Sequence, residues 1–169
     1  TDYVFDGSKA TPYHEADTLN PLSVYGRSKL AGEQAITAVG GSHLILRTSW
    51  VYSQHGKNFL LTMQRLLQER DNLNVVDDQI GAPTWAGTIA HTTVQLIERW
   101  HTGQSGPWGV YHLTAKGQAS WFDFAKEIAA HLQSQGKRVA DLHPIPSSAY
   151  PTPAQRPLNS RLDCSRLER

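Results

Sequence analysis

The sequence has 169 residues, of which 18% are charged, and its formal net charge is +1. A balance this close to neutral gives no electrostatic basis for binding nucleic acid or an anionic membrane surface. No apolar run approaches the roughly 20 residues that span a bilayer. Cys164 is the single cysteine and cannot form an internal disulfide, so we expect the reducing cytoplasm as the compartment.

The first half of the chain alternates apolar runs typical of strands with helical patterns. Asn20 is a predicted N-cap, and Pro21 suits the first position of a helix. The run at 43–49 is short and nearly continuous, which predicts a buried parallel strand. The predicted elements are the end of a strand at 1–5, a helix at 21–39, a strand at 43–49, a helix at 57–70 and a strand at 73–76.

The second half repeats this alternation. Thr84 and Ser120 are predicted N-caps of two helices. The predicted elements are a helix at 84–100, a loop at 103–109, strands at 109–113 and 139–145, and a helix at 120–133. The segment 146–157 is rich in Pro and Ser and is expected to be irregular. Alternating strands and helices predict an α/β fold.

Tyr25 and Lys29 are four residues apart, so they lie on one face of the predicted helix. A cation beside a phenol favours the phenolate and lowers the phenol pKa toward the working pH. Such a tyrosine can give a proton to a carbonyl oxygen. Gly26 and Gly32 weaken a helix by about 1 kcal/mol each, which suggests that a cofactor or a strand approaches it closely. An ordinary amphipathic helix can also carry this pair.

Further motifs support the catalytic interpretation of this helix. They are TDYVFDG at 1–7, YGRSK at 25–29, LRTSWVY at 46–52, DQIGAPT at 78–84 and YPTPAQRPLNSRL at 150–162. Together they resemble the extended short-chain dehydrogenase/reductase family over nearly the whole chain. The resemblance implies the C-terminal part of a Rossmann-like parallel sheet plus a small α/β substrate-binding lobe. Residues 1–76 would belong to the dinucleotide-binding domain, and 77–169 mostly to the lobe, with a helix at about 84–101 packing back on the sheet.

The chain opens on Thr1 inside a predicted strand and contains neither Gly-x-Gly-x-x-Gly nor its Gly-x-x-Gly-x-x-Gly variant in a strand-turn-helix context. We therefore expect a fragment that lacks the N-terminal Gly-rich cofactor-binding part and is inactive by itself. We also expect exposed apolar surface that a second copy would cover, giving a homodimer.

Within the family, the motifs are most similar to members that reduce the 4-keto group of a dTDP-linked 6-deoxysugar with NADPH or NADH. The resemblance implies that Tyr25 is the proton donor. Lys29 would tune Tyr25 and hold the nicotinamide ribose, so both residues would bind cofactor. The hydroxyl of Thr1 would bind the reacting oxygen.

Asp2, Tyr3 and Trp50 end predicted strands at the carboxyl edge, where open α/β sheets place ligands. By the resemblance they face the sugar, although a turn cap or core packing would also explain them. Arg156 is a candidate for the diphosphate, because a guanidinium forks onto phosphate oxygens. Gln79 and Thr84 are weaker substrate-loop candidates. The scattered histidines show no metal-ligand spacing, and we expect no metal site.

Two alternatives remain open. A nucleotide-sugar epimerase or dehydratase shares the Tyr-x-x-x-Lys pair, but a dehydratase adds an acidic pair beside the strand-end hydroxyl. Here Thr1 is followed by Asp2 and then Tyr3, so the second acid is absent, which counts against a dehydratase. A non-catalytic regulatory subunit on the same fold would need neither Tyr25 nor Lys29. The sequence does not decide between NADPH and NADH.

Overall fold

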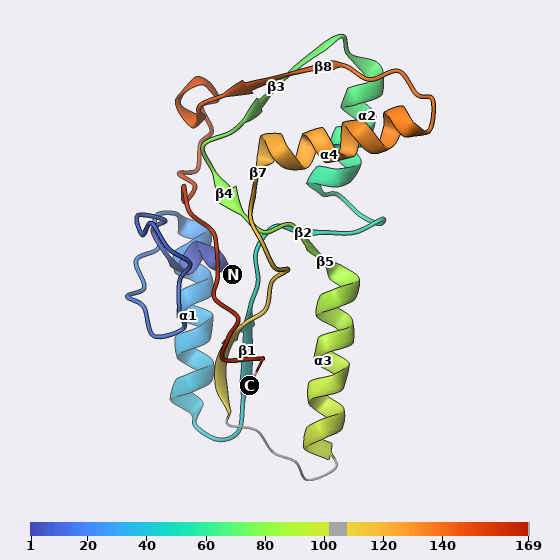
Figure 1. The fold of residues 1–169 in the computed structure, drawn as a ribbon. Coiled ribbons are helices and arrows are strands. Elements are labelled where there is room, and N and C mark those ends of the chain that lie inside the picture. The colour runs from blue at the N-terminus through green and yellow to red at the C-terminus, as the bar shows by residue number, and fades with distance from the viewer. Residues whose placement is uncertain (102–107, 169) are drawn as a thin grey trace.

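The computed structural model describes residues 1–101 and 108–168, drawn in Figure 1. The helices are α1 (Val24–Val39), α2 (Phe59–Glu69), α3 (Ala86–His101) and α4 (Trp121–Ser134), with 3₁₀ helices η1 (Asp2–Val4) and η2 (Ser147–Ala149). The strands are β1 (Leu44–Arg47), β2 (Val51–Tyr52), β3 (Asn72–Val76), β4 (Ile80–Gly81), β5 (Thr84–Trp85), β6 (Gly109–His112), β7 (Ala119–Ser120) and β8 (Asp141–Ile145). Within those residues the strands form pairs, β4–β7 antiparallel and β1–β6, β2–β5 and β3–β8 parallel.

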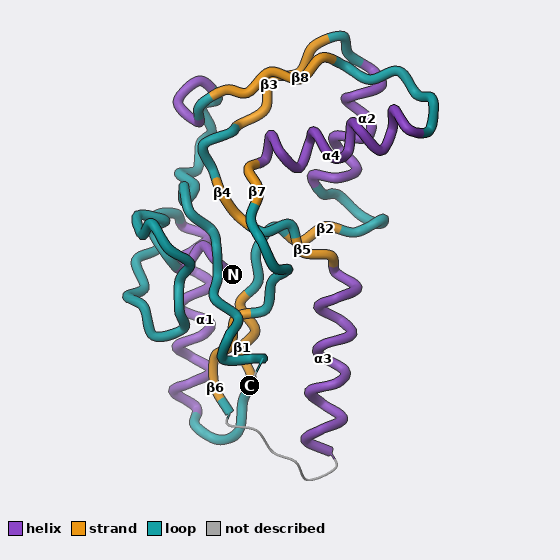
Figure 2. Tube along the Cα trace, in the orientation of Figure 1, coloured by secondary structure: helices purple, strands orange, loops and turns teal. Residues whose placement is uncertain are grey.

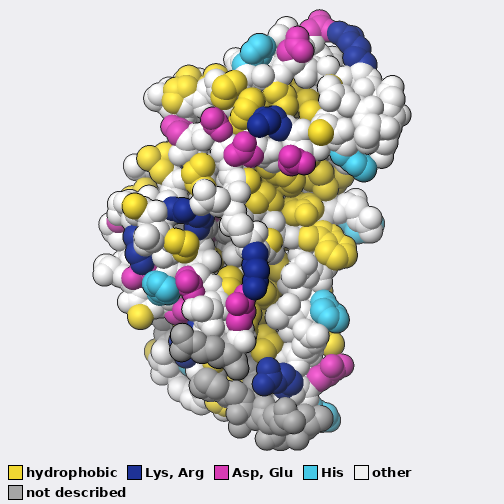
Figure 3. All heavy atoms as spheres, in the orientation of Figure 1, with side chains coloured by type: hydrophobic (Ala, Val, Ile, Leu, Met, Phe, Trp, Pro, Cys, Tyr) yellow, Lys and Arg dark blue, Asp and Glu magenta, His cyan; other side chains and the backbone are white. Residues whose placement is uncertain are grey.

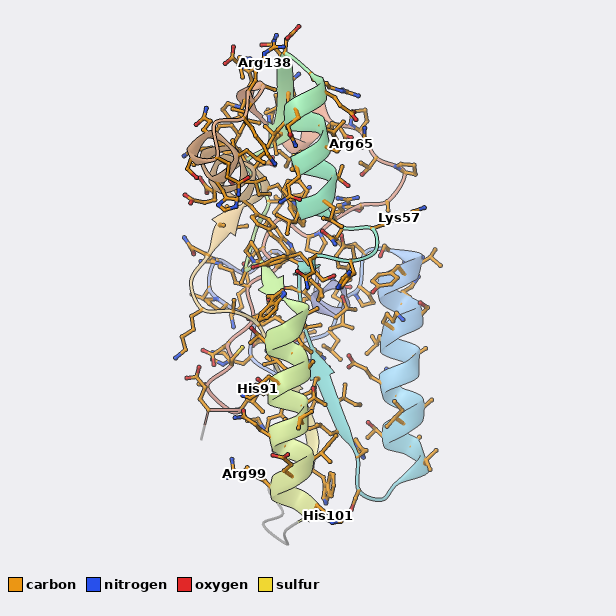
Figure 4. All side chains as sticks on the ribbon, turned by 90° about the vertical axis from the view of Figure 1, so that its right-hand side faces the viewer. Lys57, Arg65, His91, Arg99, His101 and Arg138 are labelled. Atoms are coloured by element: carbon orange, nitrogen blue, oxygen red, sulfur yellow. The ribbon has the colours of Figure 1, made fainter. Side chains whose placement is uncertain are left out.

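The lower part of the molecule holds the parallel pair β1–β6, in which Leu44 is level with Gly109 and Arg47 with His112. Helices α1 and α3 lie on either side of β1 (Figures 1 and 4). This arrangement agrees with the predicted α/β fold and its Rossmann-like parallel sheet. No described helix is long and apolar enough to cross a membrane.

The upper part is a small α/β lobe, as predicted. Strand β3 pairs in parallel with β8 over its whole length, and α2 packs against α4. These elements enclose one apolar core, made of Met63, Leu67, Leu73, Val75, Ala125, Ile128, Ala129, Leu132 and Ala140. A domain boundary at residue 76 would separate β3 from β8, so this packing favours a division before α2. The domain limits stay a prediction.

The predicted strand at 1–5 is wrong, because residues Asp2–Val4 form the 3₁₀ helix η1. The hydroxyl of Thr1 accepts a hydrogen bond from the backbone N–H of Tyr3, and the N–H of Phe5 bonds to the carbonyl of Asp2. These local bonds tighten the chain into a turn of helix. The N–H of Asp2 still bonds to the carbonyl of Thr48 at 3.2 Å, so η1 stays attached just beyond the end of β1.

Helix α1 begins three residues later than predicted. Its N-cap is Ser23, whose hydroxyl accepts from the N–H of Gly26 at 3.0 Å. Asn20 does not cap the helix, because its side chain donates to the carboxylate of Asp6. The predicted end is confirmed, since Gly40 is the C-cap and has a φ of 76°, a conformation that glycine adopts without strain.

The predicted caps of the later helices have opposite outcomes. Ser120 caps α4 in a capping box with Asp123, as expected. Thr84 does not cap α3, because it is fully buried in β5, where its hydroxyl donates to the carbonyl of Ala82. The predicted loop at 103–109 lies largely outside the described residues.

The Pro-rich segment 146–157 is irregular apart from η2, as predicted. From the upper lobe the chain descends past the N-terminal segment toward β1 (Figure 2). Isolated bridges join Asn159 to Ile80 and Leu162 to Tyr13. The C-terminal tail thus connects the upper lobe to the segment that precedes α1.

Candidate active site

A cavity of about 650 Å³ lies between η1, the first turns of α1 and the end of β1. It is lined by every residue that the sequence analysis assigned to the catalytic, cofactor or substrate site, except the weaker substrate-loop candidates Gln79 and Thr84. The lining consists of Thr1, Asp2, Tyr3, Ser23, Tyr25, Lys29, Thr48, Ser49, Trp50, Val51, Ala154 and Arg156. Residues separated by more than a hundred positions in the sequence therefore meet at one concave surface.

Tyr25 and Lys29 present their side chains to this cavity from successive turns of α1. The ammonium nitrogen of Lys29 lies 5.5 Å from the centre of the Tyr25 ring. The ring of Tyr3 meets that of Tyr25 edge to face at 5.5 Å, a favourable geometry for an aromatic pair. Tyr25 is 51% exposed, so its phenol is accessible to a ligand. The role of the pair in proton transfer stays a prediction.

Thr1 and Asp2 form a hydrogen-bonded pair at the edge of the cavity. The hydroxyl of Thr1 donates to Oδ1 of Asp2 at 3.0 Å. It must therefore turn away from Asp2 before it can donate to a ligand oxygen. Asp2 is buried, and this burial raises the pKa of its carboxyl group.

Tyr3 lies beside Arg156 of the C-terminal tail. Burial raises the pKa of the Tyr3 phenol, and the positive charge of Arg156 acts in the opposite direction. Arg156 and Ala154 line this cavity and also a larger adjoining groove of about 1220 Å³ beneath the segment 147–158. Arg156 is therefore the cation at the junction of the two hollows.

Trp50 follows Ser49 at the edge of the cavity, and its backbone has a φ of 48°, unusual for a bulky residue. Its ring stacks on that of Trp121 with 3.6 Å between centres and 8° between planes. A side-chain atom on Gly81 would lie 2.4 Å from the Trp50 ring. The ring is thus fixed by Trp121 and by the bare backbone of Gly81, while the residue still lines the cavity. Contact of Trp50 with substrate stays a prediction.

Thr48 and Ser49 are cavity residues that the sequence analysis did not assign to the site. Their hydroxyl oxygens are buried without a hydrogen-bond partner among the described residues, which costs free energy unless a ligand or another group satisfies them. Their position directly after β1, at its carboxyl end, was the available signal. Conversely, Gln79 lines the adjoining groove, where it accepts from the indole N–H of Trp121, and Thr84 lines neither hollow.

A buried ion pair beneath the cavity was also missed. Arg47 at the end of β1 is 2% exposed, and its guanidinium binds the carboxylate of Glu33 on α1. The central carbon of the Arg47 guanidinium, Cζ, lies 5.3 Å from the centre of the Phe5 ring. One side chain thus links β1, α1 and the segment after η1.

The parallel strands, the Tyr-x-x-x-Lys pair on α1 and the cavity at the carboxyl end of β1 define the class of short-chain dehydrogenase/reductase proteins with a Rossmann-like fold. Residues 1–169 match the family model described as the RmlD substrate binding domain. The chain belongs to this family.

Three proteins illustrate the similarity. The dTDP-4-dehydrorhamnose reductase of Sinorhizobium fredii is 48% identical over 170 residues, covering 100% of this chain and 57% of that protein. The crystal structure of a dTDP-4-dehydrorhamnose reductase from Clostridium acetobutylicum superposes with a TM-score of 0.88 at 38% identity, covering 99% of this chain and 56% of that one. The crystal structure of the dTDP-4-dehydrorhamnose reductase from Bacillus anthracis, solved in complex with NADP, superposes with a TM-score of 0.87 at 36% identity. The match covers 99% of this chain and 56% of that one. The chain therefore spans little more than half the length of the relatives that it matches.

Within residues 1–101 and 108–168, His, Cys, Asp and Glu form no group of three or more that could hold a metal ion. Apart from Trp50, Val51 and Ala154, the side chains that line the cavity are phenols, hydroxyls, an ammonium and a guanidinium, with one carboxyl group. This set is suited to binding anionic and hydroxyl groups and to transferring a proton.

Proposed function

We propose that the complete protein is a reductase that converts dTDP-4-dehydro-L-rhamnose to dTDP-L-rhamnose with NADPH or NADH, and that this chain supplies its proton donor and much of its sugar site. The observation that carries the proposal is the single cavity that joins Tyr25, Lys29 and Thr1 to Arg156. The names of the similar proteins in Sinorhizobium fredii and Clostridium acetobutylicum, and the NADP bound to the Bacillus anthracis protein, support it.

The residues at the cavity fit the nicotinamide end of such a cofactor. Lys29 places an ammonium beside the exposed phenol of Tyr25, and an ammonium can donate to the hydroxyls of a ribose. Tyr25 and Lys29 would hold this end, and the bound cofactor would supply a hydride to the sugar carbonyl carbon. The sequence has no Gly-x-Gly-x-x-Gly motif of the kind that holds a pyrophosphate, and the glycines at 103, 106 and 109 lead into the strand β6 instead of a helix.

The side chains of this chain would then handle the oxygen of the carbonyl group. Tyr25 gives its proton to that oxygen, and the charge of Lys29 stabilises the phenolate that remains. Thr1 turns from Asp2 and donates to the same oxygen, as in other sites where a donor meets developing negative charge. The wall formed by Trp50 orients the sugar ring, and Arg156 binds the diphosphate at the junction with the larger groove.

The test is a coupled measurement on the complete protein with dTDP-4-dehydro-L-rhamnose. We expect one NADPH or NADH consumed for each dTDP-L-rhamnose formed. An epimerase would change the configuration of the sugar without net consumption of cofactor. A regulatory subunit would bind without turnover, so either result would contradict the proposal.

A cytoplasmic location and a homodimer belong to the same proposal. The proposed substrate is a nucleotide-linked sugar. Cys164 forms no disulfide in the structure, and free thiols are usual in the reducing cytoplasm. Val39, the last residue of α1, and Ile97, in the C-terminal half of α3, are 88% and 55% exposed. Figure 3 shows apolar side chains gathered along the middle of the face drawn in Figure 1. Sedimentation of the complete protein tests whether a second copy is present.

A further inference from the structure

The buried pair of Arg47 and Glu33 lies one helical turn from the proposed catalytic lysine. Nε of Arg47 donates to both carboxylate oxygens of Glu33 at 3.1 Å, and Nη2 donates to Oε2 at 2.6 Å. The side chains are 3% and 12% exposed. Such a charge-assisted, forked arrangement is strong and directional.

Lys29 and Glu33 are four residues apart on α1 and therefore lie on the same face of the helix. A lysine four residues before a glutamate pairs less well than in the reverse order, but the two charges still attract. A carboxylate that has lost its partner near a protein interior attracts the nearest cation more strongly than an exposed one does. In the structure the Lys29 ammonium instead lies toward Tyr25, in the direction of the cavity. The Glu33 carboxylate is instead bound by Arg47 of β1.

Arg47 is itself held in place from several sides. Its guanidinium stacks over Phe5 at 5.3 Å, and Nη1 donates to the carbonyl of Glu15 at 3.5 Å. Its backbone is fixed in β1, because its carbonyl accepts from the N–H of Leu113 at 2.8 Å. Arg47 can therefore hold Glu33 without being drawn toward the cavity.

We infer that Arg47 is a positioning residue: by occupying the Glu33 carboxylate, it prevents Glu33 from capturing Lys29 and so keeps the ammonium at the cavity. This inference rests on the proposed function, in which Lys29 holds cofactor and supports Tyr25. The positioning role proposed for Arg47 can be distinguished by measurement from the role of a purely structural ion pair. If Arg47 only anchored α1, removing either partner would have the same effect on cofactor binding. If Arg47 guards Lys29, removing Arg47 alone is harmful and removing Glu33 as well restores binding.

The experiment uses the complete enzyme and its Arg47→Met, Glu33→Gln and doubly substituted variants, with NADPH binding measured by calorimetry. We expect Arg47→Met to raise the Kd for NADPH at least about fivefold, because Glu33 then pairs with Lys29. We expect Glu33→Gln and the double variant to remain within about twofold of the wild-type Kd, even though both lose thermal stability. The KM for the sugar should change less than the Kd for NADPH in Arg47→Met.

Arg65→Met is the matched control. Arg65 also pairs with a glutamate, Glu69 at 2.5 Å, but the pair is exposed on α2 in the upper lobe (Figure 4). Its Kd for NADPH should equal that of the wild type. If Arg47→Met does not fold, the Glu33→Gln variant alone decides between the two roles. A positioning role of Arg47 predicts a nearly unchanged Kd for NADPH in this variant, whereas a purely structural role in holding α1 predicts a raised Kd.

Failure of the inference can be told apart from failure of the proposed function. A wild-type enzyme that consumes no NADPH with the keto sugar contradicts the proposed function. A wild-type enzyme that is active, with a double variant that binds NADPH as poorly as Arg47→Met, overturns the inference alone.

Discussion

Gly26 on α1 lies so close to the backbone of Tyr3 on η1 that no side-chain atom fits between them. A Cβ atom on Gly26 would lie 2.3 Å from the carbonyl oxygen of Tyr3, well inside any contact that real atoms make. Gly26 is also buried. The glycine therefore lets the helix that bears Tyr25 pack directly on the segment that bears Thr1 and Tyr3.

Replacing Gly26 by alanine should therefore destabilise the protein and open the cavity. The clash is with backbone, which cannot move aside without displacing η1, and we expect a loss of about 1–3 kcal/mol, as for other overpacked sites. Gly32→Ala is the control on the same helix, because nothing lies within 4 Å of its added Cβ. That change should stabilise the protein by up to about 1 kcal/mol. Denaturant unfolding of both variants measures the difference, and equal effects would contradict this account.

The two glycines also show what the sequence can and cannot predict. Both weaken a helix equally, so the pattern suggested a close approach at each, but only the structure assigns it to Gly26. Likewise, Asn20 is as good a cap as Ser23 by residue type, and its bond to Asp6 decides against it. The N-cap at Ser120 was predicted correctly, and the structure adds Asp123 as its partner in a capping box.

Contacts between distant positions were beyond the reach of sequence patterns. The stack of Trp50 on Trp121 joins residues that no periodicity relates, and the same is true of Glu33 and Arg47. Part of the candidate site could be predicted from spacing, because Tyr25 and Lys29 lie four residues apart within one helix. The roles of Thr1, Asp2, Tyr3 and Trp50 were predicted through the resemblance of their motifs, although Asp2 and Tyr3 lie in η1 and not at the end of a strand. Thr48 and Ser49 were missed because only the structure shows that their hydroxyl groups are buried without a partner among the described residues.

Tyr25→Phe in the complete enzyme should lower kcat by roughly 10²–10⁴-fold. The substitution removes the proposed proton donor and keeps the ring, including its edge-to-face contact with Tyr3. Since Tyr25 is 51% exposed, the free energy of unfolding should change little. Steady-state kinetics with the keto sugar checks the first expectation and thermal unfolding the second. A variant with nearly wild-type kcat would remove Tyr25 from the mechanism.

Trp50→Ala should weaken sugar binding more than cofactor binding, because we place its free edge against the sugar. The same change removes the stack on Trp121 and leaves a hole beside Gly81, so stability should fall by about 3–5 kcal/mol. Trp121→Phe separates the two effects, since it disturbs the stack but leaves Trp50 in the cavity lining. A stability loss with an unchanged KM for the sugar in Trp50→Ala would show that Trp50 is a packing residue.

His112 should make the protein less stable in mild acid. It is fully buried, Nδ1 donates to the carbonyl of Tyr13, and Nε2 has no partner among the described residues. Burial lowers the pKa of His112 to about 4, while the charge of Glu15 opposes and that of Arg47 assists this shift. An unfolded histidine has a pKa near 6.5, so the unfolded state binds the extra proton between these values.

The stabilising contribution of neutral His112 is therefore present above about pH 6.5 and is lost as the pH falls toward about 4, by about 3 kcal/mol at most. Unfolding free energies measured across this range should fall more steeply for the wild type than for His112→Gln. His91→Gln, at an exposed position of α3 (Figure 4), should retain the wild-type slope. Identical slopes in all three proteins would contradict the assignment.

The 169-residue chain alone should neither bind NADPH tightly nor turn over the keto sugar. Dinucleotide binding in this fold uses a Gly-rich turn that leads from a strand into a helix, where the helix N-terminus meets the pyrophosphate. Gly103, Gly106 and Gly109 have a suitable spacing, but Gly109 opens the strand β6 instead of a helix. The chain's own contacts would be limited to Tyr25 and Lys29 at the cavity. Calorimetric titration of NADPH into the isolated chain should therefore show no saturable site at micromolar concentrations, and a micromolar Kd with one site per chain would prove that these 169 residues hold a complete cofactor site.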